Sequence, residues 1–177
     1  LMQKLLTRGI GHTKFKKITM GLRYMLETYP AEWIISTLEE NAELQRGKFG
    51  HRPRDDPDFY GGEYPFIQTG DVEKSNKYIL TYSQTLNEKG LKVSKIFPKG
   101  IIVITIAANI GSTSITTFDT CFPDSLIGIS TNSMNIEFLE YFMTTRKNYL
   151  NAVATTSAQK NINLETLETM RYYNKSL

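Results

Sequence analysis

A single cysteine and two histidines are the residues of this sequence that suit nucleophilic or general-base catalysis. The cysteine is Cys121, and the histidines, His12 and His51, lie far from each other and from it along the chain. Their spacing matches no Cys/His metal-ligand pattern, so a structural zinc site is not expected. A nucleophilic pair of Cys121 and His51 stays open. The neighbours Phe122 and Pro123, at the edge of an expected strand, favour instead a buried structural thiol.

Three aspartates, Asp55, Asp56 and Asp58, offer carboxylates of the kind that hold magnesium or line a nuclease centre. They are crowded into one proline-rich loop without an accompanying Asp and Glu-x-Lys pattern, so a solvated loop is favoured over a catalytic set. The sequence also lacks glycine-rich phosphate loops of the Walker and dinucleotide types, and it lacks an Asn-Pro-Pro-Tyr-like stretch for S-adenosylmethionine. It therefore predicts no catalytic residue, no metal and no cofactor, and a binding surface remains.

Four basic residues stand in the same long polar loop, which runs from residue 46 to residue 62. They are Arg46, Lys48, Arg52 and Arg54. Such a cluster suits phosphate neutralisation, and arginine is the commonest reader of guanine in the major groove. The alternative is a solvated loop in which these residues pair with the aspartates that follow them. The net charge of +3 permits a polyanionic partner without requiring one.

The elements that position this loop read as one α+β domain. Short β-like runs separated by turn residues cover 64–69, 101–107, 112–118 and 125–130. In the last third, Asn135 suits the start of a helix whose apolar face continues to Val153, and Asn163 suits the start of another that reaches Met170. The pattern predicts a compact mixed or antiparallel sheet domain with C-terminal helices.

The N-terminal stretch is expected to be separate from this domain. Residues 1–6 suit the last turns of an apolar-faced helix that ends near Gly9, and a second short helix is expected over 22–27, before Pro30. The expected division is a spacer helix and linker over 1–22 and the domain over 23–177. The longest apolar run, 101–108, is too short for a membrane span, which needs roughly 20 residues. With one cysteine and no signal peptide at the start, a reducing, cytoplasmic setting is expected.

Several segments, in this order and spacing, resemble the target-recognition domains of type I restriction-modification specificity subunits. The similar segments are the opening stretch 5–12, the Tyr-Pro-Phe-Ile-Gln-Thr-Gly-Asp-Val box at 64–72, Gly-Leu at 90–91 before Pro-Lys-Gly at 98–100, the Ala-Ala-Asn-Ile-Gly turn at 107–111, and the Thr-Ser-Ala-Gln-Lys-Asn-Ile connection at 156–162. Thr156 stands where the family commonly has glycine, which puts the left-handed turn there in doubt. The family's Ile-Pro segment and long coiled-coil helix are not seen before Leu177.

The resemblance implies a sequence reader without a catalytic centre. Such a domain reads one half of a split site in double-stranded DNA. Separate modification methyltransferase subunits methylate adenine, and through them restriction subunits join the complex. No membrane is implied. A dimer through the conserved helices of a full-length protein is left open.

The residues expected to touch DNA sit in the polar loops. Phosphate contacts are expected from Lys48, Lys74 and Lys160, and base contacts from Arg52, Arg54, Gln68 and Asn109. Together with Arg46 these form the expected DNA-binding set. For Gln68 and Asn109 a role in stabilising turns or strand ends is the alternative, because asparagine in particular favours left-handed turns.

Three other functions stay open. One is a specificity segment of a related, fused restriction-methylation system. Another is a small hydrolase that uses Cys121 or the loop from Asp55 to Asp58. The third is a protein-interaction module in which the late helices dock another chain.

Overall fold

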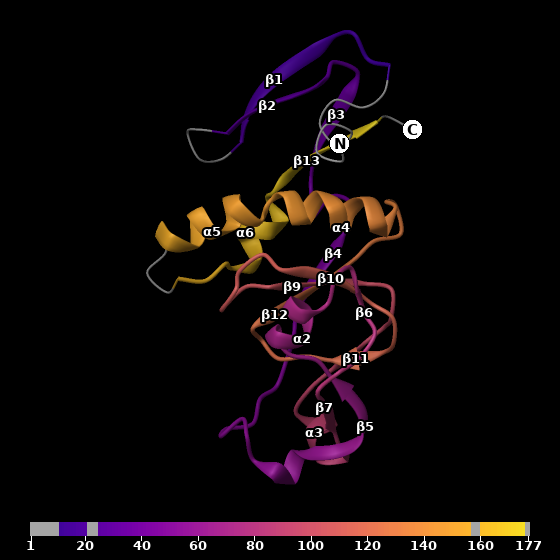
Figure 1. Cartoon of the computed structure of the whole chain (residues 1–177), viewed down its shortest axis with the longest axis vertical. Coiled ribbons are helices and arrows are strands. Elements are labelled where there is room, and N and C mark those ends of the chain that lie inside the picture. The colour runs from indigo at the N-terminus through magenta and orange to yellow at the C-terminus, as the bar shows by residue number, and fades with distance from the viewer. Residues whose placement is uncertain (1–10, 21–24, 157–159, 176–177) are drawn as a thin grey trace.

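The computed structural model describes residues 11–20, 25–156 and 160–175. Figure 1 shows these residues in three tiers along the long axis of the molecule, with strands at the top, helices over a sheet in the middle, and a second sheet at the bottom. The helix end expected over residues 1–6 lies outside the described residues, as do residues 157–159 of the connection expected at 156–162.

The upper tier is built from two pairs of antiparallel strands. Strand β1 (Phe15–Met20) pairs with β2 (Met25–Pro30), and β3 (Trp33–Thr37) pairs with β13 (Arg171–Lys175). The short helix expected over 22–27 is therefore wrong, because residues 25–30 form a strand. Local helix propensity is a weak preference, and pairing along the whole of β1 satisfies the backbone of β2 instead. The expected division after residue 22 falls between these paired strands and stays a prediction.

The middle tier contains a five-stranded mixed sheet. Its strands, in order, are β4 (Glu43–Arg46), β12 (Leu126–Ser130), β9 (Ile102–Thr105), β10 (Thr113–Thr116) and β6 (Tyr78–Ile79). The pairing of β10 with β6 is parallel, and the other pairings are antiparallel. Strands β9 and β10 are buried at every position. This is expected for the apolar run of β9, whereas β10 buries the polar side chains of Thr113, Ser114 and Thr116. The strands expected over 101–107, 112–118 and 125–130 are confirmed.

Three helices cover the middle sheet: α4 (Ile136–Thr145), α5 (Lys147–Thr156) and α6 (Leu164–Glu168). The expected starts are confirmed, because the side-chain oxygen of Asn135 accepts from the Phe138 N–H at 2.9 Å and that of Asn163 from the Thr166 N–H at 2.8 Å. The first helix is shorter than expected, since the chain turns at Arg146 into α5. Apolar side chains of the helices and the sheet form one core, which includes Ile104, Leu139, Phe142, Leu150 and Leu167.

The lower tier is a four-stranded sheet in the order β7 (Gln84–Leu86), β5 (Tyr60–Phe66), β11 (Thr120–Cys121) and β8 (Ile96–Phe97). A 3-10 turn, η1 (Pro57–Phe59), and α3 (Glu88–Lys92) flank it, and α2 (Thr69–Lys74) leads back to the middle tier. The strand expected over 64–69 ends at Phe66, because Thr69 already begins α2. With mixed sheets and C-terminal helices, the α+β class is confirmed. No helix within the described residues has the length and apolar character needed to cross a membrane.

Candidate nucleic-acid interface

Residues 47–56, here called the arginine loop, are fixed on the turn that joins β11 to β12. The N–H of Gly47 donates to the carbonyl oxygen of Leu126 at 2.9 Å, and the N–H of Lys48 donates to that of Phe122 at 2.9 Å. At Gly47 an added Cβ would lie only 2.3 Å from the carbonyl oxygen of Pro123. A residue without a side chain is therefore needed at the base of the loop.

The two arginines of this loop turn toward a carboxylate that is distant in sequence. The Arg54 guanidinium bonds to the carboxylate of Asp124, and Nη2 of Arg52 lies 3.6 Å from the same group. Nη1 of Arg52 also donates to the carbonyl oxygens of Phe49 at 2.8 Å and His51 at 2.7 Å. The sequence left open a pairing of these arginines with the nearby aspartates. In the structure both arginines contact the carboxylate of Asp124 instead.

The nearby aspartates serve the local structure of the loop. The Asp56 carboxylate accepts from the N–H of Asp58 at 3.1 Å at the start of η1, and Nε2 of His51 lies 2.9 Å from it. The backbone hydrogen bond, together with His51, holds the pKa of Asp56 below its usual value. Asp58 forms an ion pair of 3.1 Å with Lys89. Among the described residues no group of three His, Cys, Asp or Glu side chains is arranged to hold a metal ion.

The cysteine is buried in the lower tier. Cys121 has no exposed surface, and it pairs in register with Phe66 of β5. Burial raises the pKa of its thiol, so the reactive thiolate is disfavoured at neutral pH. The environment is that of a structural thiol.

We expect Cys121 in the folded chain to react with a disulfide reagent at a rate more than about tenfold below that of the unfolded chain, because the thiol is both buried and protonated. A colorimetric thiol assay with and without guanidinium measures this, and the unfolded chain should release one equivalent per chain. Rapid labelling of the folded chain would revive the hydrolase alternative, which turnover by a Cys121→Ser variant would then decide.

A second group of polar side chains gathers at the turn between β9 and β10. Asn109 adopts a left-handed conformation with φ of 54°, and its carbonyl oxygen accepts from Thr105 Oγ1 at 2.6 Å. Its side-chain amide donates to Glu73 of α2 at 2.5 Å. These contacts favour the turn-stabilising role for Asn109.

Three lysines lie around this turn. Lys74 follows Glu73 at the end of α2, and Lys160 comes two residues before Ile162, whose N–H donates to the carbonyl oxygen of Ile106 at 3.0 Å. Lys147, at the start of α5, donates to Ser112 Oγ at 3.0 Å. The turn group is defined here as Lys74, Asn109, Lys147 and Lys160. Lys147 was not predicted, because nothing in its local sequence separates it from an ordinary helix residue.

Gln68 has a position of its own, at the start of α2. Its backbone N–H donates to the Asp71 carboxylate at 2.8 Å, and its side-chain amide contacts Gln84 of β7. Gln68 is half-buried, so the structure places it as a helix-start residue that retains some exposed surface. Arg46, by contrast, is exposed at the end of β4.

Two further lysines lie beside the arginine loop. Ser94 Oγ donates to the carbonyl oxygen of Lys48 at 2.7 Å, and the N–H of Gly50 donates to that of Val93 at 2.9 Å. The exposed Lys92 and Lys95 are thereby brought next to the loop from a separate part of the chain. Sequence spacing gave no signal for this neighbourhood.

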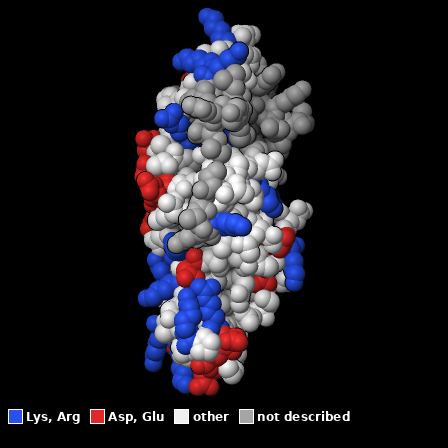
Figure 2. Space-filling model, turned by 90° about the vertical axis from the view of Figure 1, so that its left-hand side faces the viewer, with Lys and Arg blue, Asp and Glu red and all other residues white. Residues whose placement is uncertain are grey.

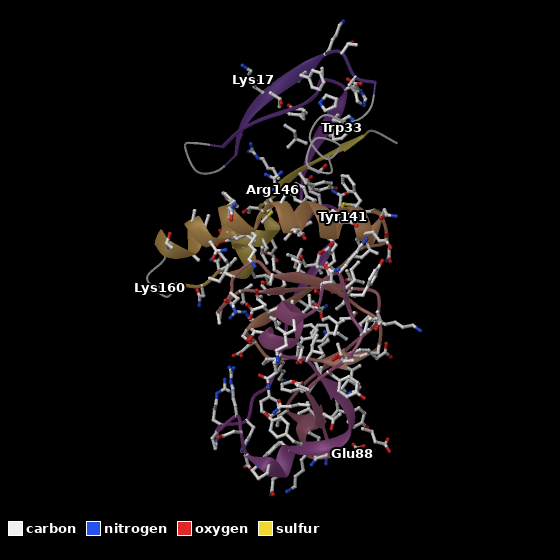
Figure 3. The ribbon with its side chains drawn as sticks, viewed as in Figure 1. Lys17, Trp33, Glu88, Tyr141, Arg146 and Lys160 are labelled. Atoms are coloured by element: carbon white, nitrogen blue, oxygen red, sulfur yellow. The ribbon has the colours of Figure 1, made fainter. Side chains whose placement is uncertain are left out.

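The arginine loop and the turn group lie on the same side of the molecule. In Figure 1 the loop after β4 and the turn between β9 and β10 both project to the left, and Figure 3 shows Lys160 on that side. Figure 2 looks onto this face and shows lysine and arginine side chains gathered mainly over the lower tier, with acidic side chains between them. Lys48, Lys74 and Lys160 make no ion pair with any of the described residues.

An α+β domain with arginine, lysine and amide side chains on the loops of one face has the features expected of a nucleic-acid-binding domain. The chain matches, over residues 30–171, a family model described as the type I restriction modification DNA specificity domain. It therefore belongs to this family, and the family that the sequence resembles is confirmed. DNA recognition for a type I restriction-modification system is the role of such a domain.

Solved structures of specificity subunits have the same fold. The chain is similar to the HsdS subunit from Thermoanaerobacter tengcongensis, with a TM-score of 0.62 at 18% identity over 90% of this chain and 35% of that one. A chain from a structure on complex assembly and conformational transition of the type I R-M system gives 0.59 at 18% identity over 89% and 37%. The S subunit from M. genitalium gives 0.57 at 11% identity over 82% and 35%. This chain thus spans about a third of the length of these proteins.

Proposed function

We propose that this domain reads one half of a split site in double-stranded DNA and thereby directs adenine methylation by partner methyltransferase subunits. Restriction subunits join the complex through the methyltransferase subunits. The methyltransferase subunits carry out the methyl transfer. The observation that carries the proposal is the arginine loop, which backbone hydrogen bonds fix on the β11–β12 turn. A fixed loop presents its side chains to a duplex without a large loss of conformational entropy on binding. With a DNA partner of this kind, a cytoplasmic location is part of the proposal.

The exposed side chains of this face divide into two kinds of contact. Lys48, Lys74 and Lys160 are exposed and free of ion pairs with the described residues, which suits them to phosphates. Arg54 presents a guanidinium group whose planar fork matches the two acceptors of guanine, and Arg52 offers the donors that its contacts with Phe49 and His51 leave unused. Phosphate contacts then set the register of the domain on the duplex, and the arginines supply sequence information.

Arg46, Gln68 and Asn109 complete the proposed surface in lesser roles. Arg46 is exposed at the end of β4, and Gln68 and Asn109 hold the start of α2 and the β9–β10 turn. We assign Arg46 to phosphate contact. Gln68 and Asn109 mainly shape the surface. Each contacts a base edge only through the exposed part of its side-chain amide.

Replacing Lys48 or Arg54 by alanine in the assembled methyltransferase is expected to give two different defects. Loss of a phosphate contact at Lys48 should weaken binding to all sequences and reduce the salt slope of the affinity by about one. Loss of Arg54 should weaken discrimination at one base position by about 1 to 3 kcal/mol. Fluorescence anisotropy on a panel of duplexes at several salt concentrations measures both.

Lys17→Ala is the matched control, since Lys17 is an exposed lysine of β1 in the upper tier, away from the arginine loop (Figure 3). It should leave the salt slope and the sequence preference as they are. If Lys48→Ala and Arg54→Ala behave like Lys17→Ala, this loop is not the reading surface.

A further inference from the structure

Asp124 is the acidic partner that two arginines of the proposed reading loop share. It lies in the turn between β11 and β12, and 41% of its side chain is exposed. Arg54 bonds to its carboxylate directly, and Arg52 approaches it to 3.6 Å. Asp124 and Arg54 are 70 positions apart in the sequence, so the fold alone creates this contact.

The two arginines use their donors differently. Nη1 of Arg52 is committed to the carbonyl oxygens of Phe49 and His51, so this side chain closes the loop on itself. The Arg54 guanidinium contacts Asp124 through Nη2 and makes no other hydrogen bond with the described residues. A guanidinium carries five N–H donors. Arg54 therefore keeps most of its donors for a ligand, while one edge of its fork is held.

The backbone of the turn that carries Asp124 is fixed relative to the loop. The N–H of Leu126 donates to the carbonyl oxygen of Pro123 at 3.0 Å and closes the turn around Asp124. The same turn receives the two backbone hydrogen bonds from Gly47 and Lys48 that anchor the loop. On the other side, the hydroxyl of Tyr60 donates to the carbonyl oxygen of Arg54. Hydrogen bonds thus hold the backbone at both residues of the Arg54–Asp124 contact.

We infer that Asp124 is a positioning residue that sets the plane of the Arg54 guanidinium for reading a base and penalises its use as a general phosphate contact. The inference rests on the proposed function. A bidentate contact with guanine requires a fixed fork, which the carboxylate supplies. A phosphate that approaches Arg54 meets the negative charge of Asp124 at short range, so binding to arbitrary sequences is weakened. The net effect is a higher ratio of specific to non-specific affinity.

Asp124→Asn removes the charge and keeps the size of the side chain. We expect affinity for non-specific duplexes to rise by roughly tenfold at low salt, with a salt slope steeper by about one. Discrimination at the base read by Arg54 should fall by roughly tenfold, because the guanidinium loses its fixed orientation. Thermal unfolding should be unchanged, since the Asp124–Arg54 pair is exposed. A residue with a purely structural role would not alter the salt slope and the preference at one base.

Two comparisons make the test selective. Asp58→Asn removes an equal charge from another exposed pair of the lower tier, the one with Lys89, and should leave the single-base preference intact. The double variant Asp124→Asn with Arg54→Ala should discriminate at that base no worse than Arg54→Ala alone, because the two residues act as one unit.

The outcomes separate the inference from the proposed function. If Arg54→Ala relaxes one base position but Asp124→Asn changes neither that preference nor the non-specific affinity, the role of Asp124 is overturned and the reading loop stands. If Arg54→Ala itself has no effect, the placement of the reading surface on this loop fails together with the inference.

Discussion

A complete type I specificity subunit that receives this domain in place of one of its own is expected to direct methylation to a new sequence in one half of its split site and to the old sequence in the other. The fold is shared with known specificity subunits at low sequence identity, so the host helices should accept the exchanged domain. The proposed reading side chains lie on its loops, so the exchange should transfer the sequence preference together with the domain.

Methylome sequencing of a host that carries the complete system measures this exchange. The unchanged half of the site is an internal control for assembly and activity. An exchanged domain with Arg54→Ala should give the same new half with one position relaxed. A methylated site that stays entirely the same after the exchange would disprove the proposed reading of DNA by this domain.

Gly47→Ala is expected to destabilise the domain by about 2 to 3 kcal/mol and to abolish sequence preference. The added Cβ would lie 2.3 Å from the carbonyl oxygen of Pro123 and 2.5 Å from that of Phe122. Both obstacles are backbone atoms of the β11–β12 turn, so the clash is relieved only by moving the loop or the turn. Either movement breaks the backbone hydrogen bonds that anchor the loop and separates Arg54 from Asp124.

Denaturant unfolding and duplex-panel binding measure the two parts of this prediction. Gly70→Ala in α2 is the matched control, because an added Cβ there has no neighbour within 4 Å and alanine is the better helix former. The denaturant midpoint of Gly70→Ala should equal or exceed that of the parent chain. Equal midpoints for Gly47→Ala and Gly70→Ala would show that the loop base tolerates a side chain.

In the middle tier, strands β9, β10 and β12 and the starts of α4 and α6 were predictable because their signals are local. Apolar runs such as 101–107 are buried strands wherever they are bounded by turn residues, and Asn135 and Asn163 cap helices through their own side chains. The strands of the upper tier were not predictable, because strand β2 depends on pairing with β1. Residues 25–30 show no strand alternation strong enough to outweigh the helix expected over 22–27.

The residue types of the candidate interface were predictable from the sequence. The contacts between these residues were not. The cluster that contains Arg52 and Arg54 is visible in the sequence, and so is the preference of Asn109 for a turn. The partner of both arginines, Asp124, lies in a turn that is distant in sequence. Lys95 lies beside the loop because its neighbours Val93 and Ser94 form hydrogen bonds with loop residues. Contacts of this kind follow from strand order, which residue spacing does not encode.

The tethering of the arginine loop has a consequence for how new target sequences arise. Its first residues are tied to the β11–β12 turn, Gly50 is tied to Val93, and Asp56 starts η1, whereas the exposed positions between these ties contribute nothing to a core. Substitutions between the ties change the chemistry offered to a duplex without altering the free energy of folding by much. If the loop reads DNA as proposed, a protein with this scaffold can therefore change its target through substitutions at a few neighbouring positions.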